Sequence, residues 1–172
     1  MTKAEQQAVS LLSSRVQLSS SRAIFTYSYG DFRGDSKELL VQYFDAMFYI
    51  ANWETLELMF LFPKALIDVE RLQKYCIEYQ IVVSESNNFV ILEISLDDDE
   101  GFGWIEGEGN LYSLIGLRQE ILQGDYHLLY VAWLKAISYL DIDELNEEEL
   151  EPPVPPELGK LSSSLEAFID AF

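Results

Sequence analysis

The chain has 172 residues, of which 49% are hydrophobic, and it carries a formal net charge of −19 with a pI of about 4.1. This is enough apolar sequence for one domain with a real core, and it excludes a chain that is disordered throughout. Charge of this sign repels phosphate groups, which argues against direct binding to nucleic acid or to an anionic membrane surface.

The N-terminal part of the sequence predicts two helices with a strand between them. Thr2 and Glu5 have the spacing of a capping box ahead of a helix over about residues 3–14. Alternating apolar and polar side chains predict a half-buried strand at 24–29. A turn rich in glycine and aspartate then leads into a second helix over about 36–44.

The run YFDAMFYIANWETLELMFLF at residues 43–62 is long and apolar enough to suggest a membrane span. Charged residues inside it, including Glu54 and Glu57, would cost several kcal/mol near the centre of a bilayer. We therefore predict two core strands at 47–52 and 56–62, and no membrane segment.

The remaining sequence predicts three more helices and one further pair of strands. Asn87 and Asn88 lie between two β-rich runs and tolerate positive φ, which is typical of a hairpin turn. The expected helices are 65–77, 110–122 and 126–140, and the expected strands are 79–84 and 89–96. The fold class is therefore α+β, with a mainly antiparallel sheet of about four to five strands and helices packed mostly on one face.

The domain organisation predicted from composition has three parts. Residues 1–140 form a single globular domain, 141–160 an acidic, proline-rich linker, and 161–172 an amphipathic C-terminal helix. The linker contains PPVPP, which has the spacing of a polyproline II ligand, but its acidic neighbours favour the role of a spacer. The apolar stripe of the C-terminal helix has to dock either on this chain or on a partner.

Several motifs resemble those of an uncharacterised bacterial protein family. They are YGDFRGD at 29–35, YFDA at 43–46, ANWET at 51–55, GWIEGEGNL at 103–111, LYVAWL at 129–134 and EPPVPPELG at 151–159. The chain departs from the family where Tyr29 replaces Trp and Glu54 replaces Gly. The resemblance implies no activity, cofactor or ligand. Because family members extend further at both ends, we expect this chain to be part of a longer protein.

The uneven charge of the two halves indicates the kind of partner. Residues 1–90 contain 11 acidic and 8 basic residues, whereas residues 91–172 contain 19 and 3. A basic protein surface is therefore the natural complement to the second half. A single cysteine and a single histidine exclude disulfides and zinc clusters, and the N-terminus has no signal-peptide pattern. We expect a cytoplasmic protein.

The residues able to carry chemistry are few and scattered. The acidic, glycine-rich loop 97–109 has oxygen ligands suited to a divalent cation, but its spacing does not fit an EF-hand. Glu106 and Glu108 are a candidate carboxylate pair, and His127 is a candidate general base. Ordinary roles account for these residues, and for Cys76 as a buried thiol. We predict no catalytic residue, no cofactor and no metal.

These observations predict a non-catalytic protein-interaction domain that belongs to a larger polypeptide or complex. The candidate contact residues are Asp31, Arg33, Trp53, Trp104, Glu106, Glu108, Leu165, Phe168, Ile169 and Phe172. Two alternatives stay open: an acidic decoy that imitates DNA and blocks a nucleic-acid-binding protein, and an enzyme with a carboxylate-based site that shows no known motif.

Overall fold

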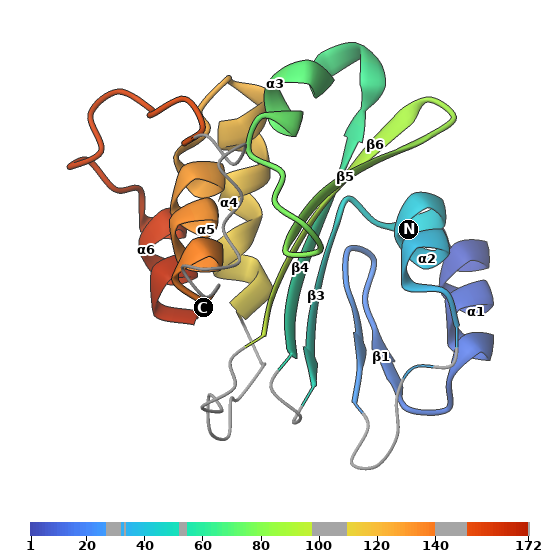
Figure 1. Cartoon of the computed structure of the whole chain (residues 1–172). Coiled ribbons are helices and arrows are strands. Elements are labelled where there is room, and N and C mark those ends of the chain that lie inside the picture. The colour runs from blue at the N-terminus through green and yellow to red at the C-terminus, as the bar shows by residue number, and fades with distance from the viewer. Residues whose placement is uncertain (27–31, 33, 52–54, 98–109, 140–150, 172) are drawn as a thin grey trace. The chain divides into compact units, whose positions relative to one another are not determined.

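The computed structural model describes residues 1–26, 32, 34–51, 55–97, 110–139 and 151–171 (Figure 1). The chain forms two compact units, residues 1–45 and residues 46–172. The described residues contain helices together with one two-stranded and one four-stranded antiparallel sheet. The α+β class predicted from the sequence is therefore confirmed.

The N-terminal unit consists of two helices and a short hairpin. Its elements are α1 (Lys3–Leu12), β1 (Val16–Leu18), β2 (Ala23–Phe25) and α2 (Ser36–Tyr43). The predicted capping box of α1 is present: the Thr2 hydroxyl accepts from the Glu5 N–H at 3.3 Å, and the Glu5 carboxylate accepts from the Thr2 N–H at 2.6 Å. The strand β1 was not predicted, because three residues are too few to show an alternating pattern.

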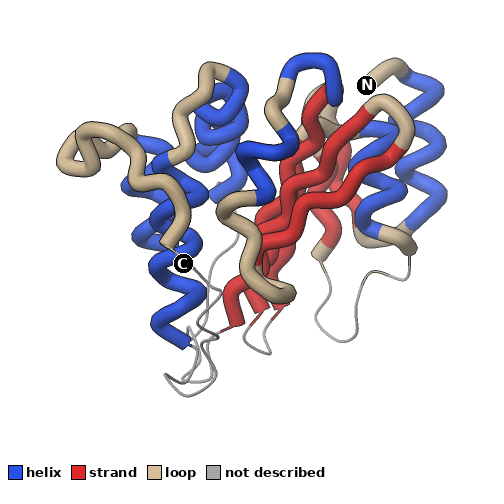
Figure 2. Tube along the Cα trace, turned by 45° about the horizontal axis from the view of Figure 1, so that its top comes forward, coloured by secondary structure: helices blue, strands red, loops and turns tan. Residues whose placement is uncertain are grey.

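The larger unit is built on a four-stranded antiparallel sheet. Its strands are β3 (Ala46–Ala51), β4 (Thr55–Pro63), β5 (Ile81–Ser86) and β6 (Phe89–Asp97), in the order β3-β4-β6-β5. Figure 2 shows these strands running side by side. The apolar run that suggested a membrane span supplies β3 and β4, as predicted. Among the residues described, no helix has the length and apolar character needed to cross a bilayer.

Three helices cover one face of this sheet. The helices of the unit are α3 (Val69–Gln73), α4 (Asn110–Leu122), α5 (His127–Tyr139) and α6 (Ser163–Ala171), with a 3-10 turn, η1 (Lys64–Leu66), after β4. Helix α4 contacts β3 and α5 contacts β6, while α6 packs against both α4 and α5. In Figure 1 these three helices stand together beside the sheet.

The main core lies between the sheet and these helices. Alternate residues of β4 and of its partner β6 point to the same face, as the two-residue period of a strand requires. The buried side chains include Leu56, Leu58, Phe60 and Phe62 on β4, Leu92, Ile94 and Leu96 on β6, and Leu114, Leu117, Leu129, Leu165 and Phe168 on the helices. Each such burial contributes about 1.5–3 kcal/mol relative to an exposed side chain.

Helix α6 closes this core within the chain itself. Leu165 is 1% exposed and Phe168 is fully buried. The approach of α6 to α4 is close, because a Cβ added at Gly116 would lie 2.3 Å from the Ser164 hydroxyl oxygen. The helix begins after Ser162, whose hydroxyl accepts from the Leu165 N–H at 3.0 Å. The C-terminal stripe therefore docks in cis.

The segment after β4 differs from the helix predicted over 65–77. Pro63 ends the strand, where it pairs with Phe89, instead of starting a helix. The Lys64 N–H then donates to the Asn88 carbonyl at 2.8 Å, which holds this segment at the hairpin. The helix begins only after Asp68, whose carboxylate accepts from the Arg71 N–H at 3.1 Å, so α3 is short.

The hairpin between β5 and β6 turns at the two predicted asparagines, and Asn87 adopts a φ of 51°. Replacing Asn87 with valine is expected to lower the free energy of unfolding by about 1–2 kcal/mol, because a β-branched residue is strained in the left-handed region. Replacing it with glycine should cost little. Urea unfolding of both variants, with Asn88→Ala as the matched control, tests this. Equal losses for valine and glycine would contradict it.

Candidate functional site

Four aromatic side chains in the described part of the larger unit lie together and form the candidate site, which we call the aromatic face. It consists of Tyr75, Tyr126, Tyr130 and Trp133, each at most 8% exposed. The last three lie on or at the start of α5 at spacings of four and three residues, which places them on one side of a helix. Tyr75 comes from the turn that follows α3, where its N–H donates to the Leu72 carbonyl.

The rings of the aromatic face are stacked in pairs. Tyr75 and Tyr126 have ring centroids 6.0 Å apart and planes that differ by 13°. Tyr130 and Trp133 have centroids 6.3 Å apart and planes that differ by 20°. The Arg71 guanidinium lies 4.6 Å from the centre of the Tyr126 ring, within the range of a cation–π contact. These contacts fix the rings on helical elements and leave the tyrosine hydroxyls to find other partners.

Those hydroxyls hold the proline segment, residues 151–156. The Tyr75 hydroxyl donates to the Pro153 carbonyl at 2.7 Å, and the Tyr130 hydroxyl donates to the Glu151 carboxylate at 2.6 Å. Pro152 and Pro155 are buried, whereas the other four residues of the segment are exposed. This part of the predicted linker is therefore attached to the domain through two buried prolines and two hydrogen bonds, while its other side chains are exposed. In Figure 1 it is drawn in orange-red between α5 and α6.

The spacing of the buried prolines matches an extended polyproline helix. A polyproline II helix has three residues per turn, so residues 152 and 155 face the same way. Proline also fixes its own φ near −65°, which favours this conformation in a segment with four prolines out of six. Two features of this segment match the way in which proline-rich peptides are recognised: buried proline side chains, and a tyrosine hydroxyl that donates to a peptide carbonyl.

Packing changes the acidity of these tyrosines. Burial raises the pKa of Tyr75 and of Tyr126 above the ordinary value of 10.0, and the Arg71 charge opposes part of that change. The hydrogen bond to Glu151 raises the pKa of Tyr130, because an ionised phenol could not donate to a carboxylate. All three hydroxyls therefore stay protonated at neutral pH.

The raised pKa values predict a loss of stability in alkali. The folded chain holds these protons more tightly than the unfolded chain does. The protonated tyrosines therefore make their full contribution to the free energy of unfolding below about pH 10, and this contribution is lost as the pH rises through the raised pKa values. Urea unfolding from about pH 8 to about pH 11 measures it. The double variant Tyr75→Phe/Tyr130→Phe should show a shallower decline. Tyr112→Phe, a change at an exposed tyrosine, should follow the wild type.

His127 and Asp125 form a pair at the start of α5. Asp125 Oδ1 accepts from the His127 N–H at 3.0 Å and lies 2.5 Å from the ring Nδ1. The other ring nitrogen, Nε2, is buried and contacts no hydrogen-bond partner within the described residues. A general base needs this nitrogen to reach the substrate, and here it faces the protein interior. The pair starts the helix and is not arranged for catalysis.

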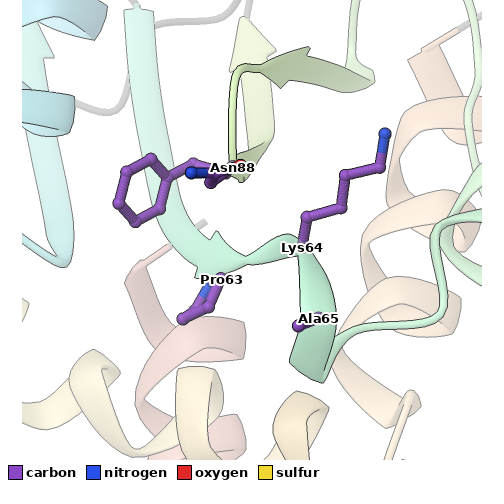
Figure 3. Close-up of a pocket in the computed structure, with 5 residues that line it drawn as sticks. Pro63, Lys64, Ala65 and Asn88 are labelled. Atoms are coloured by element: carbon purple, nitrogen blue, oxygen red, sulfur yellow. The ribbon is translucent and has the colours of Figure 1, made fainter.

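A shallow depression lies where β4 ends and meets the β5–β6 turn. It is lined by Pro63, Lys64, Ala65, Asn88 and Phe89. In Figure 3 the Lys64 side chain extends away from Pro63. Its ammonium forms an ion pair with Glu85, so the one charged group of the lining is already engaged. This depression gathers no acid, base or nucleophile that could act together.

Cys76 was expected to be buried, but the residue is exposed. The prediction placed Cys76 on the apolar face of a helix over residues 65–77. Helix α3 ends at Gln73, so Cys76 lies beyond it. Its sulfur still packs partly against the chain, and this partial burial raises the thiol pKa above 9.0. The reactive form is the thiolate, so a raised pKa makes this cysteine a poor nucleophile at neutral pH.

The predicted contact residues fall into three groups. Leu165 and Phe168 are buried in the chain's own core, because α6 docks in cis, and are not presented to a partner. Ile169, beside Leu165 at the edge of the same stripe, is 43% exposed. The others lie outside the described residues: Asp31, Arg33, Trp53, Trp104, Glu106, Glu108 and Phe172. The acidic loop 97–109, considered as a cation site and as the location of a carboxylate pair, also lies outside the described residues except for residue 97.

Sequence reasoning missed the aromatic face. Tyr126, Tyr130 and Trp133 have the spacing of a helix face in the helix expected over 126–140, but no site was predicted there, and the PPVPP run was predicted to be a spacer. The signal that could have joined them is the presence of a proline-rich segment and a row of tyrosines in one chain. Within the described ranges, no group of three His, Cys, Asp or Glu residues is placed to hold a metal ion.

Comparison with known proteins found no matching protein family, no similar curated protein and no similar solved structure. The resemblance to a bacterial family stays a prediction, and the function has to be argued from the residues of this chain.

Proposed function

We propose that this chain is a non-catalytic protein-interaction domain that acts in the cytoplasm as part of a larger polypeptide or complex. The observation that carries the proposal is the aromatic face: two tyrosine hydroxyls beside stacked rings bind a proline-rich segment by one carbonyl and one carboxylate, and two prolines of that segment are buried. Domains that bind extended peptides use the same groups. Tyrosine and tryptophan are also the residues that most often dominate binding energy at protein interfaces.

The distribution of charge supports a protein partner with a basic surface. Residues 91–172 contain 19 acidic and 3 basic residues, a density that attracts lysine- and arginine-rich surfaces and repels nucleic acid. Within the described residues, Lys64 at the surface depression pairs with Glu85, and His127 pairs with Asp125. Neither pair is part of a group of titratable side chains around an open site among these residues. This supports binding over catalysis.

Affinity capture from a native lysate of the source organism tests the proposal. The bait is the full chain, and the control is an unrelated acidic protein of similar pI. We expect a protein bound to the chain but not to the control, in a complex of fixed stoichiometry. Binding should weaken as salt rises from about 0.1 M to about 1 M, because screening shortens the range of charge attraction.

The opposite result would count against an interaction domain. If the chain recovers nothing beyond the proteins bound by the control, and a small-molecule library raises its melting temperature instead, the enzyme alternative gains support. Partner binding that is weak and insensitive to salt would remove the role assigned to the acidic half.

A further inference from the structure

We infer that the aromatic face is a binding site for proline-rich peptides of the type Glu-Pro-x-x-Pro, and that residues 151–156 occupy it as a ligand from the same chain. This deepens the proposed function by naming the class of partner. The segment bound at the aromatic face is itself such a sequence, Glu151-Pro-Pro-Val-Pro-Pro156, so its contacts show which chemical groups the face accepts.

Four anchor points along the segment define that chemistry. Glu151 accepts from the Tyr130 hydroxyl, and the Pro153 carbonyl accepts from the Tyr75 hydroxyl. Pro152 and Pro155 supply the two buried rings. The intervening Val154 is 53% exposed, so its position tolerates other side chains. Pro153 is exposed too and contributes only its backbone carbonyl, so the recognised pattern is an acid, a proline, two positions open to other residues and a proline.

The face is built on elements other than the segment it holds. Two of its rings belong to α5, the third directly precedes α5 and the fourth follows α3, and the rings stack within each pair. Arg71 adds a cation beside Tyr126 that does not depend on the segment. A site preformed in this way pays little ordering cost when a ligand binds, which is the condition for exchanging one peptide for another.

A ligand carried on the same chain competes strongly with a free one. Tethering gives it an effective concentration of the order of millimolar, so a free peptide binds the intact chain weakly and binds more tightly once the tethered ligand is impaired. The contacts of residues 151–156 are few: two hydrogen bonds and two prolines. The proline segment can therefore give way to a partner's proline-rich stretch that makes additional contacts elsewhere.

The test uses a fluorescein-labelled peptide of sequence EPPVPPELG and fluorescence anisotropy. The full chain is compared with Pro152→Ala/Pro155→Ala, which weakens the tethered ligand and leaves the face intact. We expect this variant to bind the peptide about tenfold or more tightly than the wild type does. Adding Tyr75→Phe and Tyr130→Phe to it should abolish that gain. A peptide with alanine at both buried positions, EAPVAPELG, should not bind.

Circular dichroism and a cooperative thermal transition establish that each variant is folded. If the double proline variant does not fold, Glu151→Ala replaces it, since this exposed residue contributes only the Tyr130 contact. The expected gain in peptide affinity is then smaller, about threefold. A folded variant that binds the peptide no better than the wild type overturns the inference, as does binding that survives the loss of both hydroxyls.

Sedimentation velocity identifies the other occupant, a second copy of this chain. The wild type and the double proline variant are compared over a range of protein concentrations. If the fraction of dimer rises with concentration and differs between the two, the proline segment is exchanged between copies, and the inference of a separate partner is overturned. A monomer at all concentrations supports it. Failure to bind this peptide leaves the lysate capture unaffected, because that experiment detects partners of any sequence, so the two proposals fail separately.

Discussion

Replacing Phe168 with alanine is expected to lower the free energy of unfolding of the larger unit by about 3–5 kcal/mol. The ring is fully buried and belongs to the same core cluster as Leu165, Leu117 and Leu129. Removing it takes away the transfer free energy of the ring and leaves a cavity between α6, α4 and α5 that these helices can only partly fill. Urea unfolding followed by circular dichroism measures the loss.

Ile169→Ala is the matched control for Phe168→Ala. Ile169 lies on the same helix, one residue further on, and is 43% exposed. Its replacement should change the free energy of unfolding by no more than about 0.5 kcal/mol, as is usual at the surface. If the two variants were equally stable, α6 would not be docked on its own chain, and its apolar stripe would again be a surface for a partner.

The docking of α6 changes where a partner is to be sought. The sequence predicted the apolar stripe of the final helix as a contact surface, because an amphipathic helix has to bury its apolar side somewhere. Leu165 and Phe168 bury theirs in cis, so they stabilise the domain. The proline segment ahead of α6 is thereby fixed at its C-terminal end, within reach of the tyrosines. In the proposed function, the aromatic face is the contact surface in place of the helix.

Most of the larger sheet could be predicted because its patterns are local. The two strands flanking residues 52–54 are nearly continuous apolar runs, and Asn87 and Asn88 mark a hairpin by their tolerance of positive φ. The extent of α3 could not be predicted. Pro63 is compatible both with a helix start and with a strand end, and the pairing with Phe89 that decides between them comes from a distant part of the chain.

The aromatic face could not be predicted for a similar reason. It joins Tyr75 to residues 50 or more positions later in the chain, and only the folded chain brings them together. Tyrosine at helical spacing is far more often core than site, and a proline run with acidic neighbours is more often a spacer. Both readings are sound for each segment alone. The tyrosines do belong to the buried core. What neither segment's pattern shows is that the two segments contact each other.

Replacing Tyr75 with alanine is expected to cost about 3–5 kcal/mol, the range found when a large buried ring is truncated. Tyr75 is 1% exposed, stacks on Tyr126 and holds the Pro153 carbonyl, so its loss removes a ring contact and releases the proline segment together. Urea unfolding measures the free energy. Hydrogen exchange at the amides of Val154 and Glu151 shows whether the segment is released.

Tyr75→Phe separates the two contributions. It keeps the ring and its stacking and removes only the hydroxyl, so it should cost about 1 kcal/mol, the usual net value of one hydrogen bond. It should nevertheless raise hydrogen exchange in the segment, because the Pro153 carbonyl then loses its donor. If Tyr75→Phe were as damaging as Tyr75→Ala, the hydroxyl would do far more than hold one carbonyl. If neither variant changed amide hydrogen exchange in residues 151–156, Tyr75 would only fill the core. This result would contradict the proposal that the aromatic face binds peptides.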